Sequence, residues 1–241
     1  MGGVGWFPQL EAEMKRIGRV VASIRARRRR GQSLVEFAIL LPVLLIMLSG
    51  VIEFGIMLNY YLDLIDAARE AARWASDADP IRDPNTGAYL NPNPQFYQDV
   101  QQLAKESLKA ASDNRIDWID DPPAGGVDDD DDDCNITING GNDIVISAFG
   151  AMDGAVSARF PPGSPNGLSL CGHQNSAFTS AEIAALLDPL APTTGLVLVE
   201  VFYDYHMIMA LPWITAFVPD PVTLHAYSIM PNANVEPTPT P

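Results

Sequence analysis

The sequence has few of the residues and motifs that enzymes and metal proteins use. Its 241 residues include two cysteines and three histidines, and none of them stands at the paired spacing of a zinc site. There is no phosphate-binding glycine loop, no G-x-S-x-G and no H-E-x-x-H motif. Cys171-Gly-His173 brings a thiol and an imidazole close in sequence, which is too little to define a nucleophile and its base. The sequence therefore predicts a non-enzymatic protein without catalytic residues, metal or cofactor.

Basic residues are scarce beyond the first thirty positions. Residues 1–30 carry a net charge of +6 and the whole chain −15, so residues 31–241 carry −21. This balance excludes nucleic acid as a partner of the folded part, because phosphate binding needs clustered positive charge. Lysine and arginine are enriched on the cytoplasmic side of membrane helices. The change of sign predicts a basic cytoplasmic leader over residues 1–31 and an acidic domain outside the membrane.

Only one stretch is apolar enough to cross a membrane. Residues 37–52 carry no charge, and after Glu53 the apolar character resumes to Leu58. As a helix, residues 37–58 would be about 33 Å long, which matches the hydrocarbon core of a bilayer. A cleaved secretory signal has a shorter apolar region followed by small residues. Here an apolar stripe continues instead, which predicts one long helix over residues 32–76. The stripe comprises Leu58, Leu62, Ile65, Ala68, Ala72 and Ala75.

Two acidic residues, Glu36 and Glu53, flank the uncharged core of this segment. A charge inside a bilayer costs about 2–3 kcal/mol and usually has a partner. We expect Glu53 to lie near the interface and to reach solvent. Glu36 has a second interpretation, since it follows Ser33 at the spacing of a capping box at the start of a helix.

The residues around Glu36 form the most informative motif, Arg-Arg-Arg-Arg-Gly-Gln-Ser-Leu-Val-Glu-Phe over positions 27–37. It resembles the processing site of type IV pilin-like precursors, which have a basic leader ending in glycine and a glutamate at the fifth mature position. By this resemblance Gly31 ends the leader, Gln32 begins the mature chain, Glu36 is its fifth residue and Phe37 its sixth. Glycine also suits a scissile bond that must be extended and closely approached.

The longer segment 29–75, and more weakly 195–230, resembles the TadE-like family, the pseudopilins of the tight-adherence (Flp, type IVc-like) pilus assembly system. The chain departs from that family in its large exported domain and its leader of about 30 residues; a start at Met14 would shorten the leader. The resemblance implies cleavage after Gly31 by a prepilin-type peptidase. It also implies pairing of Glu36 with the new amine of a neighbouring subunit, and partners among other pilins, pseudopilins and the assembly platform.

The exported domain, residues 77–233, is predicted to be α+β, with an antiparallel β-sheet and short helices. Helical patterns occur at 94–111 and after a Thr179–Glu182 capping box. Strand patterns occur at 134–138, 143–148, 155–160, 196–207 and 222–230, and the last two are expected to pair. The acidic run Asp128–Asp133 is interpreted as a solvated loop, with calcium binding as the alternative, and residues 234–241 as an extended Pro/Thr tail.

Two features of this domain have alternative interpretations. Outside the cell, Cys134 and Cys171 would form a disulfide; otherwise they are unpaired thiols. Residues 207–218 carry no charge. They are either core packed on the sheet or an exposed patch around Trp213 and Phe217 that docks a partner or the membrane surface.

Taken together, the sequence predicts a single-pass protein of the cytoplasmic (inner) membrane, with its N-terminus inside and membrane lipid around its helix. We interpret it as a TadE-like minor pilin or pseudopilin for Flp-type pilus assembly or surface adhesion. The alternative is an uncleaved, membrane-anchored extracytoplasmic binding module, a receptor or adhesin. Cleavage after Gly31 distinguishes the two.

Overall fold

The computed structural model describes residues 7–83, 85–90, 92–112, 116, 141–187 and 194–235. The predicted strand at 134–138, the acidic run Asp128–Asp133 and the tail from residue 236 lie outside this range. The chain divides into two units, Met1–Ile52 and Glu53–Pro241. Each is described separately.

The first unit is a helix. It forms the beginning of α1, which runs from Phe7 to Ala75 and contains Pro42 without being interrupted there. The predicted helix start at Ser33 is therefore wrong, because the backbone is already helical through the basic leader. Residues 7–30 include seven arginines, three alanines and two glutamates, and these residue types favour helix. The helix ends at Ala75, one residue before the predicted end.

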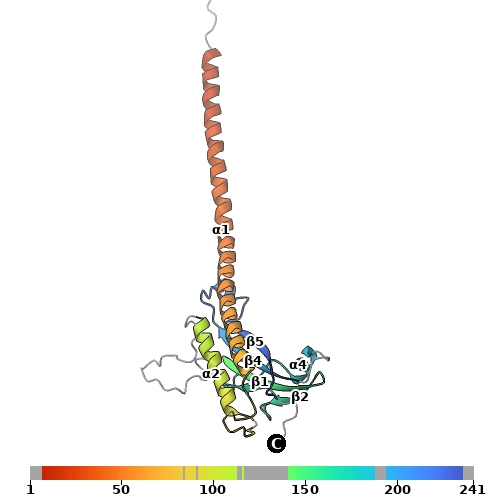
Figure 1. The fold of residues 1–241 in the computed structure, drawn as a ribbon. Coiled ribbons are helices and arrows are strands. Elements are labelled where there is room, and N and C mark those ends of the chain that lie inside the picture. Colours follow the sequence, from red (N-terminus) through yellow and green to blue (C-terminus); the bar gives the residue numbers. More distant parts are fainter. Residues whose placement is uncertain are drawn as a thin grey trace, which may run out of the picture. The chain divides into compact units, whose positions relative to one another are not determined.

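The second unit contains a five-stranded antiparallel sheet (Figure 1). Its strands are β1 (Asp143–Met152), β2 (Ala155–Phe160), β3 (Leu168–Ser169), β4 (Thr194–Tyr205) and β5 (Val222–Asn232). The order is β2-β1-β4-β5, with β3 pairing β1. β1 and β2 are joined by Asp153-Gly154, both at positive φ (51° and 74°), as a two-residue hairpin turn requires. The predicted pairing of the last two strands is confirmed, in the register Val201↔Ala226.

The described residues of this unit include three further helices. α2 (Pro94–Ala111) has proline in its first turn and begins at Asn93, whose side chain accepts a hydrogen bond from Gln95 N. α4 (Ser180–Leu186) begins at the predicted Thr179–Glu182 capping box, and both of its hydrogen bonds are present. α5 (Pro212–Thr215) is a single turn between β4 and β5. The predicted α+β class is confirmed.

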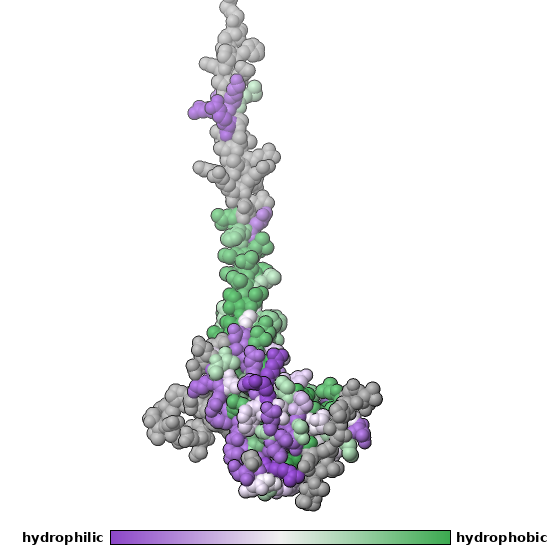
Figure 2. Space-filling model, in the orientation of Figure 1, coloured by the Kyte–Doolittle hydropathy of each residue, from purple (hydrophilic) through white to green (hydrophobic). Residues whose placement is uncertain are grey.

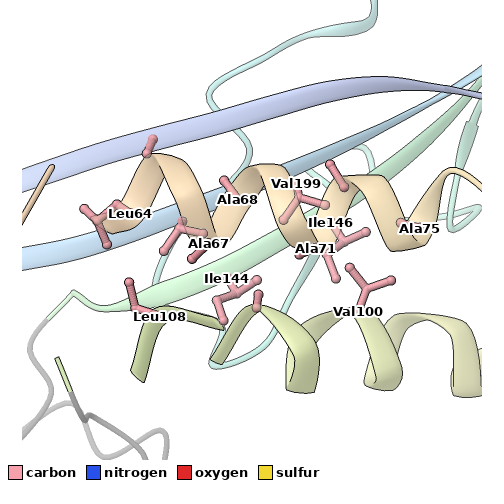
Figure 3. Close-up of a cluster of buried hydrophobic side chains, with 14 of the residues drawn as sticks. Leu64, Ala67, Ala68, Ala71, Ala75, Val100, Leu108, Ile144, Ile146 and Val199 are labelled. Atoms are coloured by element: carbon pink, nitrogen blue, oxygen red, sulfur yellow. The ribbon is translucent and has the colours of Figure 1, made fainter. Parts of the chain in front are cut away.

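One face of the sheet packs against α2 and the 53–75 part of α1. The buried side of α1 is made mainly of alanine, which lets its backbone approach the sheet closely. Figure 3 shows these alanines meeting Val100 and Leu108 of α2, and Ile144, Ile146 and Val199 of the sheet. The fully buried residues of α1 are Leu64, Ala67, Ala68, Ala71, Ala72 and Ala75. The predicted stripe is thus right for Ala68, Ala72 and Ala75, and wrong for the exposed Leu58 and Leu62.

Candidate functional site

The residues predicted to be processed lie within helix α1. Gly31 and Gln32 are helical in the uncomplexed chain, and cleavage after Gly31 stays a prediction. The side chain of Phe37 is 62% exposed, and that of Glu36 is exposed as well. A peptidase acting here would have to unwind about one helical turn to bring the Gly31 carbonyl into reach.

The apolar part of α1 has the surface of a membrane segment. Within the described residues, Leu34–Ala75 holds the one helix that is long and apolar enough to cross a membrane, and only 6% of its most apolar window is buried. A core helix of a soluble protein would be mostly buried. Figure 2 shows the apolar side chains as a continuous green surface on the helix. With the family match given below, this indicates a membrane-anchored protein.

Glu53 forms the most fully bonded acidic site on α1. Its Oε1 accepts hydrogen bonds from the Tyr205 hydroxyl at 2.6 Å and from Ile208 N at 2.9 Å, and its Oε2 accepts one from Met209 N at 2.9 Å. The side chain is 5% exposed. The expectation that Glu53 reaches solvent is therefore wrong, because three donors from β4 and the loop that follows it replace the water.

Tyr205 is placed to keep its proton and donate it to Glu53. It is the last residue of β4 and is fully buried, with its ring edge-on to Tyr60 of α1 at 5.3 Å. Burial, and then the hydrogen bond to Glu53, raise the pKa of the Tyr205 phenol. Glu53 thus joins α1 to the end of β4 and to the loop that follows.

That loop contains the predicted patch. Phe217 is 87% exposed and Trp213 41% exposed. The interpretation of residues 207–218 as core is wrong for these two and for Ile208, and right for Met207, which is buried, and Ile214, which packs partly against the core. Among residues 207–218, Met207 belongs to the core cluster and Ile214 packs against it. That cluster is formed by α1, α2 and the sheet.

The opposite face of the sheet contains a buried polar cluster. Glu200 on β4 is fully buried and accepts hydrogen bonds through Oε1 from Ala177 N at 2.9 Å, while His225 Nε2 lies 3.1 Å away. Arg159 on β2 donates to the Phe178 carbonyl and to Ser147 Oγ, and burial lowers its pKa. Within the described residues, Glu200 Oε2 and Arg159 Nε have no hydrogen-bond partner.

Asp143, at the start of β1, organises the segment that carries Cys171. Its carboxylate accepts from Ser169 Oγ and from the backbone amides of Cys171, His173 and Gln174. His173 Nδ1 lies 3.1 Å from the Asn142 carbonyl. Among the described residues, no group of three or more His, Cys, Asp or Glu side chains is placed to hold a metal. Cys134 lies outside the described residues, so its disulfide with Cys171 stays a prediction.

Two of these arrangements were missed from sequence for a physical reason. The bonds of Glu53 to residues 205–209 and of Asp143 to residues 169–174 link positions far apart in the chain. A single acidic residue in a periodic pattern does not reveal a distant donor. The sequence offered one signal for Glu53. A charge beside an uncharged run is costly, which indicates that it has a partner but not which residue the partner is.

Comparison with known proteins identifies the amino-terminal part of the chain. Residues 31–73 match the family model described as TadE-like protein. No curated protein and no solved structure matches the chain. The predicted resemblance is therefore confirmed over residues 31–73. The match covers 43 of the 241 residues, and TadE-like proteins are components of pilus systems.

Proposed function

We propose that this TadE-like chain is a minor pilin or pseudopilin of Flp-type pilus assembly, cleaved after Gly31 by a prepilin-type peptidase. The observation that carries the proposal is the family match over residues 31–73. This segment begins at the proposed cleavage site, includes Glu36 at the fifth mature position, and continues into the exposed apolar helix. No other part of the described chain offers a comparable functional signature.

The residues before Gly31 support recognition at the cytoplasmic membrane surface. Arg27–Arg30 form a compact positive charge directly ahead of the glycine, and such charge is retained on the cytoplasmic side during insertion. Glycine lowers the cost of leaving the helix, by about 1 kcal/mol relative to alanine. The helix can thus be unwound locally at the one position where the peptidase needs an open backbone.

Cleavage would create a cationic group with which Glu36 can pair. The new N-terminal amine of Gln32 is cationic at neutral pH, and a carboxylate at the membrane edge is stabilised by an opposite charge. Glu36 of one subunit would pair with the Gln32 amine of the next, so that processing and assembly are linked. The exposed apolar side chains of residues 34–48 would then contact lipid or the helices of neighbouring pilins.

We place the acidic domain outside the membrane and the leader inside. The support is the charge asymmetry, +6 over residues 1–30 against −21 over the remainder. Outside, the domain would contact other pilus components or a surface, which is the basis for a role in pilus assembly or adhesion.

An uncleaved membrane-anchored binding module is the second candidate function. One observation favours it: α1 is helical without a break from Phe7 through Gly31. Such a protein would keep its leader and capture a ligand through its exported domain.

The mature N-terminus tests the proposal. The full chain is expressed with an active prepilin-type peptidase of a Tad system, and its N-terminal peptide is determined by mass spectrometry. We expect a start at Gln32. Gly31→Val should block cleavage, because a β-branched side chain occupies the scissile position.

Gly50→Val is the matched control, since it makes the same change in the same helix. A Cβ at Gly50 meets no atom within 4 Å, so this variant should be cleaved like the unchanged chain. If the leader persists in the unchanged chain while a known prepilin in the same cells is processed, the pseudopilin assignment is wrong and the binding module is favoured.

A further inference from the structure

The loop between β4 and β5, residues 206–221, presents apolar side chains to its surroundings. Residues 207–219 carry no charge, and we call residues 207–218 the apolar loop. Phe217 and Ile208 are 87% and 61% exposed. Met209, Trp213 and Val218 are also exposed. Exposed apolar side chains grouped in this way mark a surface that contacts protein or lipid.

The apolar loop is held in place rather than left free. Glu53 accepts hydrogen bonds from the backbone amides of Ile208 and Met209. At the base of the loop, Asp220 Oδ1 lies 3.3 Å from His206 Nδ1 and accepts from Met207 N. Ala210 adopts a positive φ of 39° directly after the amides that Glu53 binds, a conformation that alanine takes only when its surroundings impose it.

The tip of the loop satisfies much of its own backbone. In the turn of α5, the amides of Ile214 and Thr215 donate to the Leu211 carbonyl, and those of Phe217 and Val218 donate to the Ile214 carbonyl. Unsatisfied backbone groups are the main obstacle to placing a loop in an apolar medium. The turn lowers that cost at the positions with the most exposed side chains.

The position of Glu53 in the chain indicates that lipid surrounds the apolar loop. It directly follows Ile52, the last residue of the uncharged run that begins at Phe37. The amides of Ile208 and Met209 therefore lie one hydrogen bond away from the residue at which the helix leaves its uncharged segment. The apolar loop is thus bonded to the residue that directly follows the uncharged run. Tryptophan and other large apolar side chains are favoured at the boundary between membrane and water.

We propose that the apolar loop enters the headgroup and acyl boundary of the leaflet from which the helix emerges, as a second membrane contact of the exported domain. Phospholipid is the occupant, because the loop carries no charge and is bonded to the membrane helix itself. Glu53 has its role in this arrangement: it neutralises no cation but fixes the loop at the depth where its side chains reach lipid. The proposal is independent of cleavage at Gly31.

Photocrosslinking in a bilayer tests the inference. The full chain is reconstituted in vesicles of phosphatidylethanolamine and phosphatidylglycerol, with p-benzoylphenylalanine in place of Phe217 or Ile208. Leu44, in the apolar run, is the positive control. Leu186 on α4 is the matched negative control, because its exposure of 65% is close to the 61% of Ile208 and Leu44. After irradiation, peptides carrying the mass of a phospholipid are quantified.

We expect lipid adducts at positions 217 and 208 to exceed those at 186 by about tenfold, the ratio that about 1.4 kcal/mol of preferential lipid contact gives. Phe217→Asp should reduce the adduct at position 208, whereas Leu186→Asp should leave it unchanged. Equal adducts at 217 and 186, or adducts to protein alone when the same probes are irradiated in cells, would overturn the proposal and identify a non-lipid surface.

Discussion

At the scale of single residues, Glu53 shows how an acidic side chain is accommodated next to an apolar helix. Its carboxylate receives three hydrogen bonds, from one hydroxyl and two backbone amides. Hydrogen bonds to a charged acceptor contribute about 1.5–3 kcal/mol each, more than neutral ones. They offset the loss of water at a side chain that is 5% exposed. The residue therefore serves as a structural connection, not as a solvated boundary charge.

Replacing this carboxylate should loosen the loop. In Glu53→Gln, an amide NH2 replaces one carboxylate oxygen. This group is itself a donor, so it cannot accept a hydrogen bond from the Met209 N–H or from the neighbouring donors. We expect a loss of about 1–3 kcal/mol of stability and faster amide hydrogen exchange at Ile208 and Met209. Thermal unfolding and hydrogen-exchange mass spectrometry of the full chain in detergent measure both.

Glu70→Gln is the control for that variant. Glu70 lies on the same helix, and its ion pair with Arg73 is exposed, so its loss should change the stability little. Unchanged exchange at residues 208 and 209 in Glu53→Gln would show that the carboxylate does not hold the loop.

At the scale of elements, the alanine side of α1 determines how closely the helix approaches the sheet and α2. Ala71 is fully buried and lies among Val100, Ile146 and Val199 in Figure 3. Interiors packed this densely have no room for three further carbon atoms. The helix is held by close contact of small side chains rather than by large ones that interdigitate.

Overpacking this surface should destabilise the domain. We expect Ala71→Leu to cost about 1–3 kcal/mol and to lower the midpoint of thermal unfolding by several degrees. Ala110→Leu makes the same change at an exposed position of α2 and should change the midpoint little. A similar midpoint for both variants would mean that α1 does not pack as tightly as its buried alanines indicate.

The elements themselves could be predicted well where the pattern was local. The α2 helix, the β2 strand and the Thr179–Glu182 capping box follow from residues within a few positions of one another. Val197, Val199 and Val201 alternate along β4 with other residues, and all three lie in the same core cluster.

What could not be predicted depends on which distant segment covers each surface. Alternation placed Glu200 on the second face of β4, but its full burial results from the segment around Ala177, which donates to it. Phe217 is the opposite case, an apolar residue that is exposed although its neighbours in sequence resemble those of a core residue. It is exposed because the core is already filled, which depends on the packing of α1 and α2. Neither outcome is encoded in residues nearby in the chain.

At the scale of the whole molecule, the chain combines three regions of different chemistry. A basic leader is followed by an exposed apolar helix and then by an acidic domain. In the proposed orientation, the charge of residues 1–30 favours their retention inside, and the apolar helix then leaves the domain on the other side. The proposed role in assembly requires something further, a contact specific to other pilus subunits.

Glu36 is the residue on which we expect that contact to depend. Glu36→Gln keeps the shape of the side chain and removes its charge, so membrane insertion and cleavage after Gly31 should be unchanged. Pairing with the Gln32 amine of a neighbouring subunit should be lost, and with it about tenfold or more of the recovery with other pilus components, the equivalent of about 1.4 kcal/mol. Co-purification from membranes solubilised in mild detergent measures this.

The control is Glu13→Gln, which removes the same charge from an exposed position of the leader that is absent after cleavage. It should assemble like the unchanged chain. Two other results would contradict a role in assembly alone. If Glu36→Gln also prevents cleavage, the carboxylate acts in recognition by the peptidase. If it is cleaved and still co-purifies normally, the apolar helix alone is sufficient for association, and the pairing of Glu36 with a neighbouring amine is wrong.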